Sequence, residues 1–290
     1  MPRSNDIQIR DPFVLPVEQE KRYYLFGTTD KDPWNAPGLG FNCYKSNDLQ
    51  NWDGPIPAFR RPPHFWGRRH FWAPEVHPYK GRFFMFATFA GDGIRQGTAI
   101  LASETPDGPY IPHSDGAVTP KDWEGLDGTF FVEDGQPWMV FCREWVQVQD
   151  GQICAMRLTG DLTRPATEPT VLFRASEAPW IRPHVWEGKD NYVTDGPFMY
   201  RTASGELLMM WSSFDEHGYA VGIAVSESGK LCGPWKHHPE PLYSGDGGHG
   251  MLFKTFDGKL KLALHSPNDT PNERPIFIPV QDKAGRLTIE

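Results

Sequence analysis

The chain has 290 residues and a net charge of −8, and glycine and proline account for 29 and 28 of its residues. This length is enough for one domain with a full core, and so many turn-forming residues favour short strands over helices. The 37 acidic against 29 basic residues leave no positive field to attract nucleic acid or an anionic membrane. We therefore expect one all-β domain over residues 1–290 that partners neither nucleic acid nor membrane.

The N-terminal residues, MPRSNDIQIRDPF, lack the apolar stretch of a secretory signal. No apolar run approaches the ~18 residues that a membrane-spanning helix requires. These features predict a cytoplasmic protein. The cysteines lie far apart without a CxxC pair, so we expect neither a zinc site nor a dense disulfide framework; they are Cys43, Cys142, Cys154 and Cys232.

The first motif along the chain is IRDPF, in which Asp11 stands between apolar neighbours. Pro12 restrains the residue before it, so we expect an extended backbone at Asp11. Two later segments, LDGTFF around Asp127 and VTDGPF around Asp195, also place an acid at the start of an apolar segment. One interpretation is that such acids only accept backbone N–H groups; the other is that all three share a pocket.

Five pairs of apolar segments recur, about one for every 58 residues, and each pair is separated from the next by turn-forming residues. They span residues 21–30 with 38–52, 81–90 with 97–110, 135–147 with 151–162, 205–214 with 219–235, and 258–268 with 274–287. A unit of this length with about four short strands is typical of a β-propeller blade. We predict a five-bladed β-propeller, with a β-sandwich as the alternative.

Three segments that each follow a predicted strand support the repeat. SNDLQNWDGP, SETPDGPY and SESGKLCGPW all begin with serine and end on Gly-Pro close to an aromatic residue, although ordinary turn chemistry also favours such residues. In a propeller, the segments that lead into the innermost strands converge at one mouth of the channel. Asp11, Asp127 and Asp195, at the starts of the first, third and fourth blades, would then meet in one pocket.

Carboxylates that meet in a pocket could hydrolyse a glycosidic bond. One acid protonates the leaving oxygen, one base activates water, and a third carboxylate raises the pKa of the acid by repulsion. Trp34 and Trp72 lie on predicted loops, where aromatic rings could bind the apolar face of a sugar. The Arg-rich loop 60–71 is expected to be solvated and to close the pocket. The segment GDGGHGM lacks the setting of a phosphate-binding loop.

These segments resemble, in order and over nearly the whole chain, the motifs of glycoside hydrolase family 43. The matching segments are RDPF around Asp11, FWAPEV at 71–76, LDGTFF around Asp127 and VTDGPF around Asp195. The resemblance implies a five-bladed β-propeller that hydrolyses arabinose-, xylose- or galactose-containing glycans with inversion. It implies that Asp11 is the base, that Asp127 tunes the acid, and that Asp195 is the acid.

The fourth match departs from the family pattern, which carries glutamate where this chain has Asp195. Aspartate is shorter by one carbon–carbon bond, about 1.5 Å, and proton transfer needs hydrogen-bond reach. Another group could therefore be the acid, and that alternative stays open. The candidates are Glu75, Glu144, Glu187 and His249.

The residues expected to bind substrate are Trp72, Glu75, Trp34, His249 and Arg274. In similar enzymes a histidine of the last blade lies near the channel axis, where it contacts the sugar or a structural calcium. No HExxH or EF-hand spacing is present, so we expect no required cofactor and no catalytic metal. Arg274 could hold Asp11 ionised by a charge-assisted bond; an exposed arginine at the end of a loop is the alternative.

We therefore expect an inverting glycosidase, a monomer or small homo-oligomer, that releases a terminal sugar from short oligosaccharides. Among sugars, α-L-arabinofuranose is favoured over β-D-xylose and β-D-galactofuranose, because the resemblance makes it the most frequent. The alternative is a glycan-binding propeller that has lost the usual acid. A sucrose- or fructan-acting propeller is disfavoured because no Asn-Asp-Pro-Asn-Gly segment stands near the N-terminus.

Overall fold

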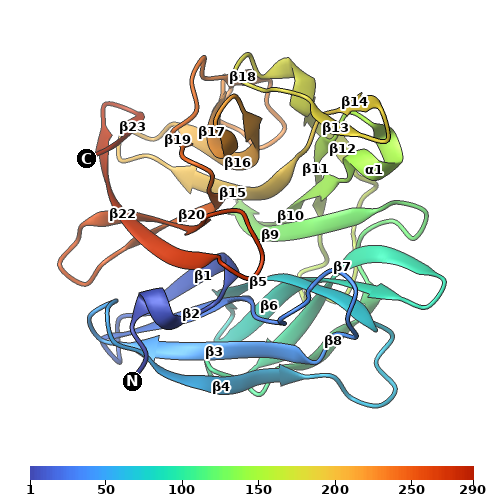
Figure 1. Ribbon diagram of the computed structural model, residues 1–290, viewed down its shortest axis with the longest axis vertical. Helices are drawn as coiled ribbons and strands as arrows, with labels where there is room; N and C mark the ends of the chain where they lie inside the picture. The colour runs from blue at the N-terminus through green and yellow to red at the C-terminus, as the bar shows by residue number, and fades with distance from the viewer.

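A computed structural model describes all 290 residues and consists of five antiparallel sheets arranged around a central axis (Figure 1). Each sheet uses four strands in sequence order, and the innermost strands contact one another in cyclic order. This arrangement is a five-bladed β-propeller, as predicted. The innermost strands are β1 (Arg10–Val17), β5 (Arg69–Tyr79), β9 (Gly125–Glu133), β15 (Asp195–Arg201) and β20 (Gly248–Lys254).

The other strands of each blade follow outward from the channel. The second strands are β2 (Arg22–Thr28), β6 (Arg82–Gly91), β10 (Gln136–Arg143), β16 (Leu207–Asp215) and β21 (Leu260–Ser266). The third strands are β3 (Gly40–Ser46), β7 (Ile94–Ser103), β11 (Gln152–Arg157), β17 (Gly218–Ser226) and β22 (Arg274–Lys283). The outermost strands are β4 (Asp53–Arg60), β8 (Ile111–Ala117), β12 (Thr170–Arg174), β18 (Trp235–His237) and β23 (Arg286–Ile289).

A few short elements lie outside this pattern. The strand β19 (Tyr243–Ser244) adds to blade 4 by pairing with β17, and the hairpin of β13 (His184–Trp186) and β14 (Lys189–Asn191) is inserted between blades 3 and 4. The helical turns are η1 (Ser4–Asp6), α1 (Trp145–Val148) and η2 (Ala175–Glu177). None of the helices is long and apolar enough to cross a membrane.

The five predicted pairs of apolar segments correspond to the second and third strands of the five blades. Their nearly continuous apolar runs follow from burial on both faces, since each blade packs between two neighbours. In β10, alternate residues face opposite sides. Met139 and Phe141 pack in a cluster with blade 2, whereas Val140 and Cys142 pack in a cluster with blade 4. The hydrophobic core therefore consists of layers between blades.

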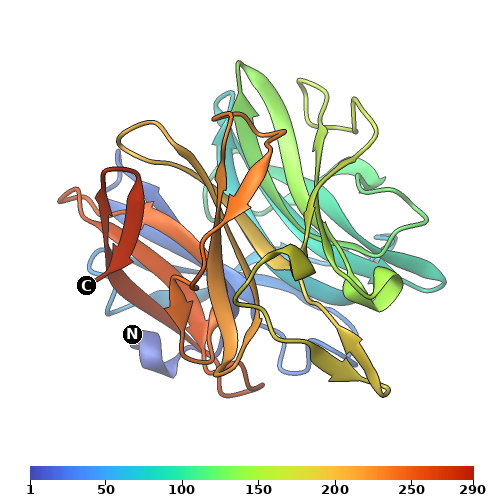
Figure 2. The same ribbon diagram turned by 90° about the horizontal axis from the view of Figure 1, so that it is seen from above.

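The ring closes between the first and last blades without a shared strand. Both termini lie on the same side of the molecule (Figure 2), where β1 contacts β20 and the Ile9 N–H donates to the Glu273 carbonyl at 3.3 Å. The Arg10 guanidinium forms an ion pair with the buried Glu273 carboxylate at 2.8 Å. This closure brings the start of the chain to the channel.

Candidate active site

Each innermost strand carries a β-bulge near its start. At corresponding bulges one residue of each strand adopts a positive φ; these residues are Asp11 (53°), Ala73 (46°), Asp127 (54°), Gly196 (47°) and His249 (53°). β5 has a second bulge, in which His70 also has a positive φ. This left-handed conformation is unfavourable by roughly 1–2 kcal/mol for a residue with a side chain. The prediction of an extended Asp11 is therefore wrong, because the bulge overrides the restraint from Pro12.

Side chains from the preceding blade hold four of these bulges. In each case a backbone N–H donates to a side chain at the end of the neighbouring second strand. The bonds run from Asp11 to His265 Nδ1 (3.1 Å), from Ala73 to Thr28 Oγ1 (2.9 Å), from Asp127 to Thr88 Oγ1 (3.0 Å) and from His249 to Ser212 Oγ (2.8 Å). The blades are thus joined at the positions that carry the site.

The joint between blades 3 and 4 differs. Cys142 occupies the place of the serine, threonine or histidine acceptor, since it pairs with Leu126 as Ser212 pairs with Asp195. Instead, the Gly196 N–H donates to Asp127 Oδ2 at 3.1 Å. By this register Gly196, not Asp195, corresponds to Asp11 and Asp127. Asp195 lies one residue earlier, so its side chain leaves the strand in a different direction.

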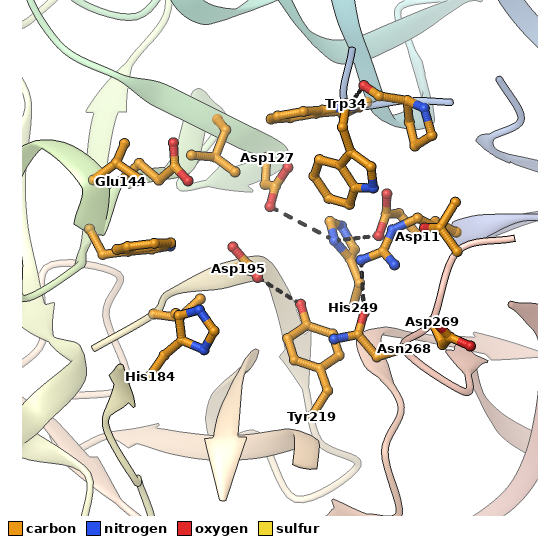
Figure 3. A pocket seen from close by; sticks show the side chains of 18 of the residues that line it. Asp11, Trp34, Asp127, Glu144, His184, Asp195, Tyr219, His249, Asn268 and Asp269 are labelled. Carbon is orange, nitrogen blue, oxygen red and sulfur yellow. Dashed lines mark hydrogen bonds and ion pairs between the residues drawn. The ribbon is translucent and has the colours of Figure 1, made fainter. Parts of the chain in front are cut away.

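A cavity of about 990 Å³ opens at these bulges, and the three predicted acids Asp11, Asp127 and Asp195 line it. They come from three different blades and lie around one hollow (Figure 3). Glu144, at the end of β10, and His249 line the same cavity. The structure therefore brings together residues as far apart in sequence as 11 and 249.

Asp11 is surrounded by positive and polar groups. Its Oδ1 lies 3.2 Å from His249 Nδ1, and its Oδ2 accepts a hydrogen bond from Thr28 Oγ1 at 2.8 Å. Burial alone would raise the pKa of Asp11, but His249 and Arg10 outweigh burial and hold it far below its usual range. Asp11 is therefore a carboxylate at neutral pH.

His249 lies between two carboxylates. Its Nδ1 is 3.2 Å from Asp11 and 3.8 Å from Asp127 Oδ2. Burial would lower the pKa of the imidazole, but the two carboxylates raise it to about 10. His265, also buried, has its pKa lowered to about 3 by burial and by Arg10, so it is neutral and its Nδ1 can accept the Asp11 N–H. His249 is consequently a buried cation of the site, and Arg10 is a second cation there.

Asp127 and Asp195 lie farther along the cavity. Burial raises the pKa of Asp127 to about 7, with His249 opposing and the charges of Asp195 and Asp11 adding to the shift. Burial also raises the pKa of Asp195, while the Tyr219 hydroxyl, which donates to Asp195 Oδ2 at 2.9 Å, opposes it. Both acids are thus harder to ionise than Asp11.

Glu144 is the N-cap residue of α1, and the Gln96 side-chain amide donates to its Oε2. Burial and the nearby charges of Asp195 and Asp127 raise the pKa of Glu144 to about 8. Unlike Asp11, it has no positive group among its partners. At neutral pH this carboxyl therefore holds a proton.

Aromatic rings flank the acids on two sides. On one side Trp34 and Trp72 meet edge to face with ring centroids 5.2 Å apart, and Trp72 stacks on His70. On the other side His184 and Trp186, in the inserted hairpin, contact Trp145. Except for His70, these rings line the cavity and could contact the apolar faces of sugars. Trp72 lies within β5 and not on a loop, contrary to expectation.

Two predicted substrate-binding residues do not reach the cavity. Glu75 is only 6% exposed, and its carboxylate pairs with His77 Nε2 at 2.9 Å. Arg274 donates from Nε to the Asn5 carbonyl at 2.9 Å, and its other bonds are to carbonyls of its own loop. The cations beside Asp11 are His249 and Arg10. Glu75 lies within β5 beside a bulge and Arg274 begins β22, and each side chain has a structural partner instead of the cavity.

The segment 60–71 does not close the pocket. None of its residues lines the cavity, and its Phe65 is buried against Phe89 with ring centroids 4.9 Å apart. Residues 31–35 and 268–271 line the cavity instead. Aromatic residues in an Arg-rich loop were a signal of packing that the sequence interpretation did not use.

The predicted calcium site lies near His249, where Asp11 and Asp127 are the nearest acids. Calcium takes six to eight oxygen ligands, and the carboxylate oxygens nearest His249 Nδ1 are those of Asp11 at 3.2 Å and Asp127 at 3.8 Å. No group of three or more His, Cys, Asp or Glu residues is arranged to hold a metal ion. Calcium binding near His249 stays a prediction for experiment, and no step below involves a metal.

Several site residues had no clear signal in the sequence. Arg10 and Tyr219 lie inside strand patterns, where a polar or aromatic residue is unremarkable. His184 and Trp186 belong to an insertion outside the blade repeat. Arg10, next to Asp11 in the first motif, could have been found by asking which cation holds that carboxylate ionised.

An ionised carboxylate and a protonated carboxyl at one sugar-sized cavity are the groups that glycoside hydrolysis requires. The fold and the site together define a β-propeller glycosidase. The sequence pattern described as "Glycosyl hydrolases family 43" matches residues 6–281, and the chain belongs to this family.

Several proteins that act on arabinose-containing glycans are similar to this chain. The crystal structure of an endo-arabinase from Bacteroides thetaiotaomicron is 42% identical in sequence, with a TM-score of 0.90 and 98% of each chain covered. The extracellular exo-α-(1→5)-L-arabinofuranosidase ArbA of Cellvibrio japonicus is 26% identical, over 91% of this chain and 80% of that protein. The extracellular endo-α-(1→5)-L-arabinanase 1 of Bacillus subtilis is 24% identical, over 57% of this chain and 53% of that protein.

The prediction of a cytoplasmic location is wrong in the light of these relatives. The curated relatives from Cellvibrio japonicus, Streptomyces chartreusis and Bacillus subtilis are all named extracellular enzymes, which points to secretion. The prediction rested on the first residues of the chain, which carry too little information for such a conclusion.

Proposed function

We propose that this glycosidase releases terminal α-L-arabinofuranose from short α-linked arabino-oligosaccharides with inversion at the anomeric carbon. The observation that carries the proposal is the opposed ionisation of carboxyl groups around one cavity, with Asp11 held ionised by His249 and Arg10. The arabinose-acting relatives support this sugar ahead of β-D-xylose and β-D-galactofuranose. The flanking rings of Trp34 and His184 would hold the sugar faces.

In the proposed reaction, Asp11 takes a proton from a water molecule while that water attacks the anomeric carbon. The bond from that carbon to the leaving oxygen breaks, and a carboxyl group on the side of Asp195 and Glu144 gives its proton to the oxygen. Asp127 lies between the two sides, where its charge favours the protonated form of the acid. Asp195 stands where the family pattern has the acid.

A panel of aryl glycosides and linear arabino-oligosaccharides tests this proposal. We expect cleavage of the α-L-arabinofuranoside, arabinose as the first product from arabinopentaose, and initial release of the β-anomer by proton NMR. Faster cleavage of a xyloside or galactofuranoside would overturn the sugar assignment. A ladder of shorter oligosaccharides would overturn terminal release, and initial release of the α-anomer would overturn inversion.

A further inference from the structure

Asp195 is one bond shorter than the glutamate that the family pattern places at this position. Asp195 also accepts the Tyr219 hydroxyl on Oδ2 at 2.9 Å. Burial and the charge of Asp11 raise the pKa of Asp195, but this hydrogen bond and the positive charges of His249 and Arg10 oppose that rise. Three neighbours thus oppose the protonated state that a proton donor needs.

A second carboxyl on the same side of the cavity has the opposite surroundings. Glu144 lines the cavity beyond Asp195 and Asp127, and in Figure 3 those two acids lie between it and the cation His249. The charged groups that act on Glu144 are Asp195, Asp127 and Glu124, all negative. Only the Gln96 amide favours its ionised form.

The backbone and one hydrogen bond fix the Glu144 carboxyl. The Glu144 N–H donates to the Glu124 carbonyl at 2.8 Å, and its own carbonyl accepts the Gln147 N–H at 3.0 Å where α1 begins. On the side chain, Oε2 accepts from Gln96, whose own Oε1 contacts His70 Nδ1 at 3.1 Å. With Oε2 occupied, Oε1 is the atom that can carry a proton toward a ligand.

We propose that Glu144, and not Asp195, is the catalytic residue that donates the proton to the leaving oxygen. This inference rests on the proposed hydrolysis. As the glycosidic bond breaks, the electron pair stays on the leaving oxygen and takes the proton from Glu144 Oε1. Asp11 takes the proton of the attacking water, and both carboxyls return to their starting states by exchange with solvent. Asp195 orients the sugar through its side-chain oxygens.

The leaving group distinguishes a proton donor from other residues, because a dinitrophenolate departs without protonation whereas a sugar hydroxyl does not. The experiment compares kcat/KM for arabinobiose and for 2,4-dinitrophenyl α-L-arabinofuranoside in Glu144→Gln and Asp195→Asn. We expect Glu144→Gln to lose ~10²–10⁴-fold on arabinobiose and less than about tenfold on the aryl glycoside. Asp195→Asn should lose similar factors on both substrates.

The matched control is Glu216→Gln, because the Glu216 side chain is 67% exposed and does not line the cavity. It should leave both rates unchanged. If Glu144→Gln does not fold, Glu144→Asp provides the test, with a loss on arabinobiose that exceeds its loss on the aryl glycoside. The assignment would be overturned if each Glu144 variant lost kcat/KM equally on both substrates. It would also be overturned if Asp195→Asn lost kcat/KM on arabinobiose but not on the aryl glycoside. Failure of the parent enzyme on both arabinosides would instead overturn the proposed function.

Discussion

Asp11 and Glu144 are carboxylic acids at the same cavity, yet their surroundings shift their pKa values in opposite directions. Asp11 lies 3.2 Å from the His249 imidazolium, which lowers its pKa in spite of burial. Glu144 is buried beside Asp195 and Asp127, and its pKa is raised to about 8. The comparison teaches that the neighbours, and not the residue type, divide the carboxyls into a base and an acid.

The largest expected effect on activity comes from replacing Asp11. Asp11→Asn removes the proposed base, so we expect kcat to fall by ~10²–10⁴-fold. The loss should be similar for arabinobiose and for the dinitrophenyl glycoside, because water must be activated in both reactions. Steady-state kinetics on the two substrates measure this. A loss confined to arabinobiose would make Asp11 the acid and reverse the comparison.

Removal of the cation should weaken the fold as well as the site. His249→Gln leaves Asp11 and Asp127 without their shared positive partner, which we expect to lower the free energy of unfolding by ~3–5 kcal/mol. The pKa of His249 is raised from 6.5 to about 10, so its stabilisation is full below pH 6.5 and is lost as the pH rises through 10. Urea unfolding at pH 6 and pH 10 measures the difference.

The control for this variant is His217→Gln, because the His217 side chain is 66% exposed and contacts only Glu216. This variant should unfold at the same urea concentration as the parent. A destabilisation by His249→Gln that is as large at pH 10 as at pH 6 would contradict the charge of the imidazole.

Replacing Glu144, the proposed acid, should stabilise the protein at pH 8. The pKa of Glu144 is raised to about 8, so ionisation in the unfolded chain reduces stability progressively from pH ~4.5 to 8. Glu144→Gln removes this penalty, and after allowance for solvent access we expect a gain of ~1–2 kcal/mol at pH 8 and none at pH 4. Thermal unfolding at both pH values checks this. A loss of stability at pH 8 in Glu144→Gln would show that Glu144 ionises as readily in the folded protein as in the unfolded chain.

The smallest expected effect on activity comes from Tyr219, the neighbour of Asp195. Tyr219→Phe removes the hydroxyl that donates to Asp195 Oδ2, a hydrogen bond to a charged group that contributes ~1.5–3 kcal/mol. We expect the pKa of Asp195 to rise, and kcat/KM for arabinobiose to fall by less than for Glu144→Gln. Kinetics on the pair of variants measure the ranking. A larger loss for Tyr219→Phe would move the proton donor back to Asp195.

The fold could be predicted from the sequence because burial of both faces of a blade leaves a direct mark on the residues. GRFFMFATFA and GELLMMWSSF contain the unbroken apolar runs FFMFA and LLMMW, and these segments became the second strands β6 and β16. The carboxylates of Asp11 and Asp127 could also be placed, since an acid at the start of such a blade has few places to lie. That these two acids share one cavity followed from the predicted ring of five blades.

The contacts of the site could not be predicted, because bulges and loop turns decide them. Asp195 looks equivalent to Asp11 in sequence, yet it lies one register position earlier. Arg274 and Glu75 were expected near substrate, but Arg274 donates to backbone carbonyls and Glu75 pairs with His77. The charge of His249 depends on Asp11, more than two hundred residues away, and no local pattern reports such a distance.

The most direct test of the central claim is the pH dependence of kcat/KM for arabinobiose with the parent enzyme. Because Asp11 is ionised throughout and Glu144 loses its proton with a pKa of about 8, the rate should be level from pH 5 to pH 7 and fall with a midpoint near 8. A rate that rises with pH across this neutral range, or that stays level up to pH 10, would contradict the division of the two carboxyls into base and acid.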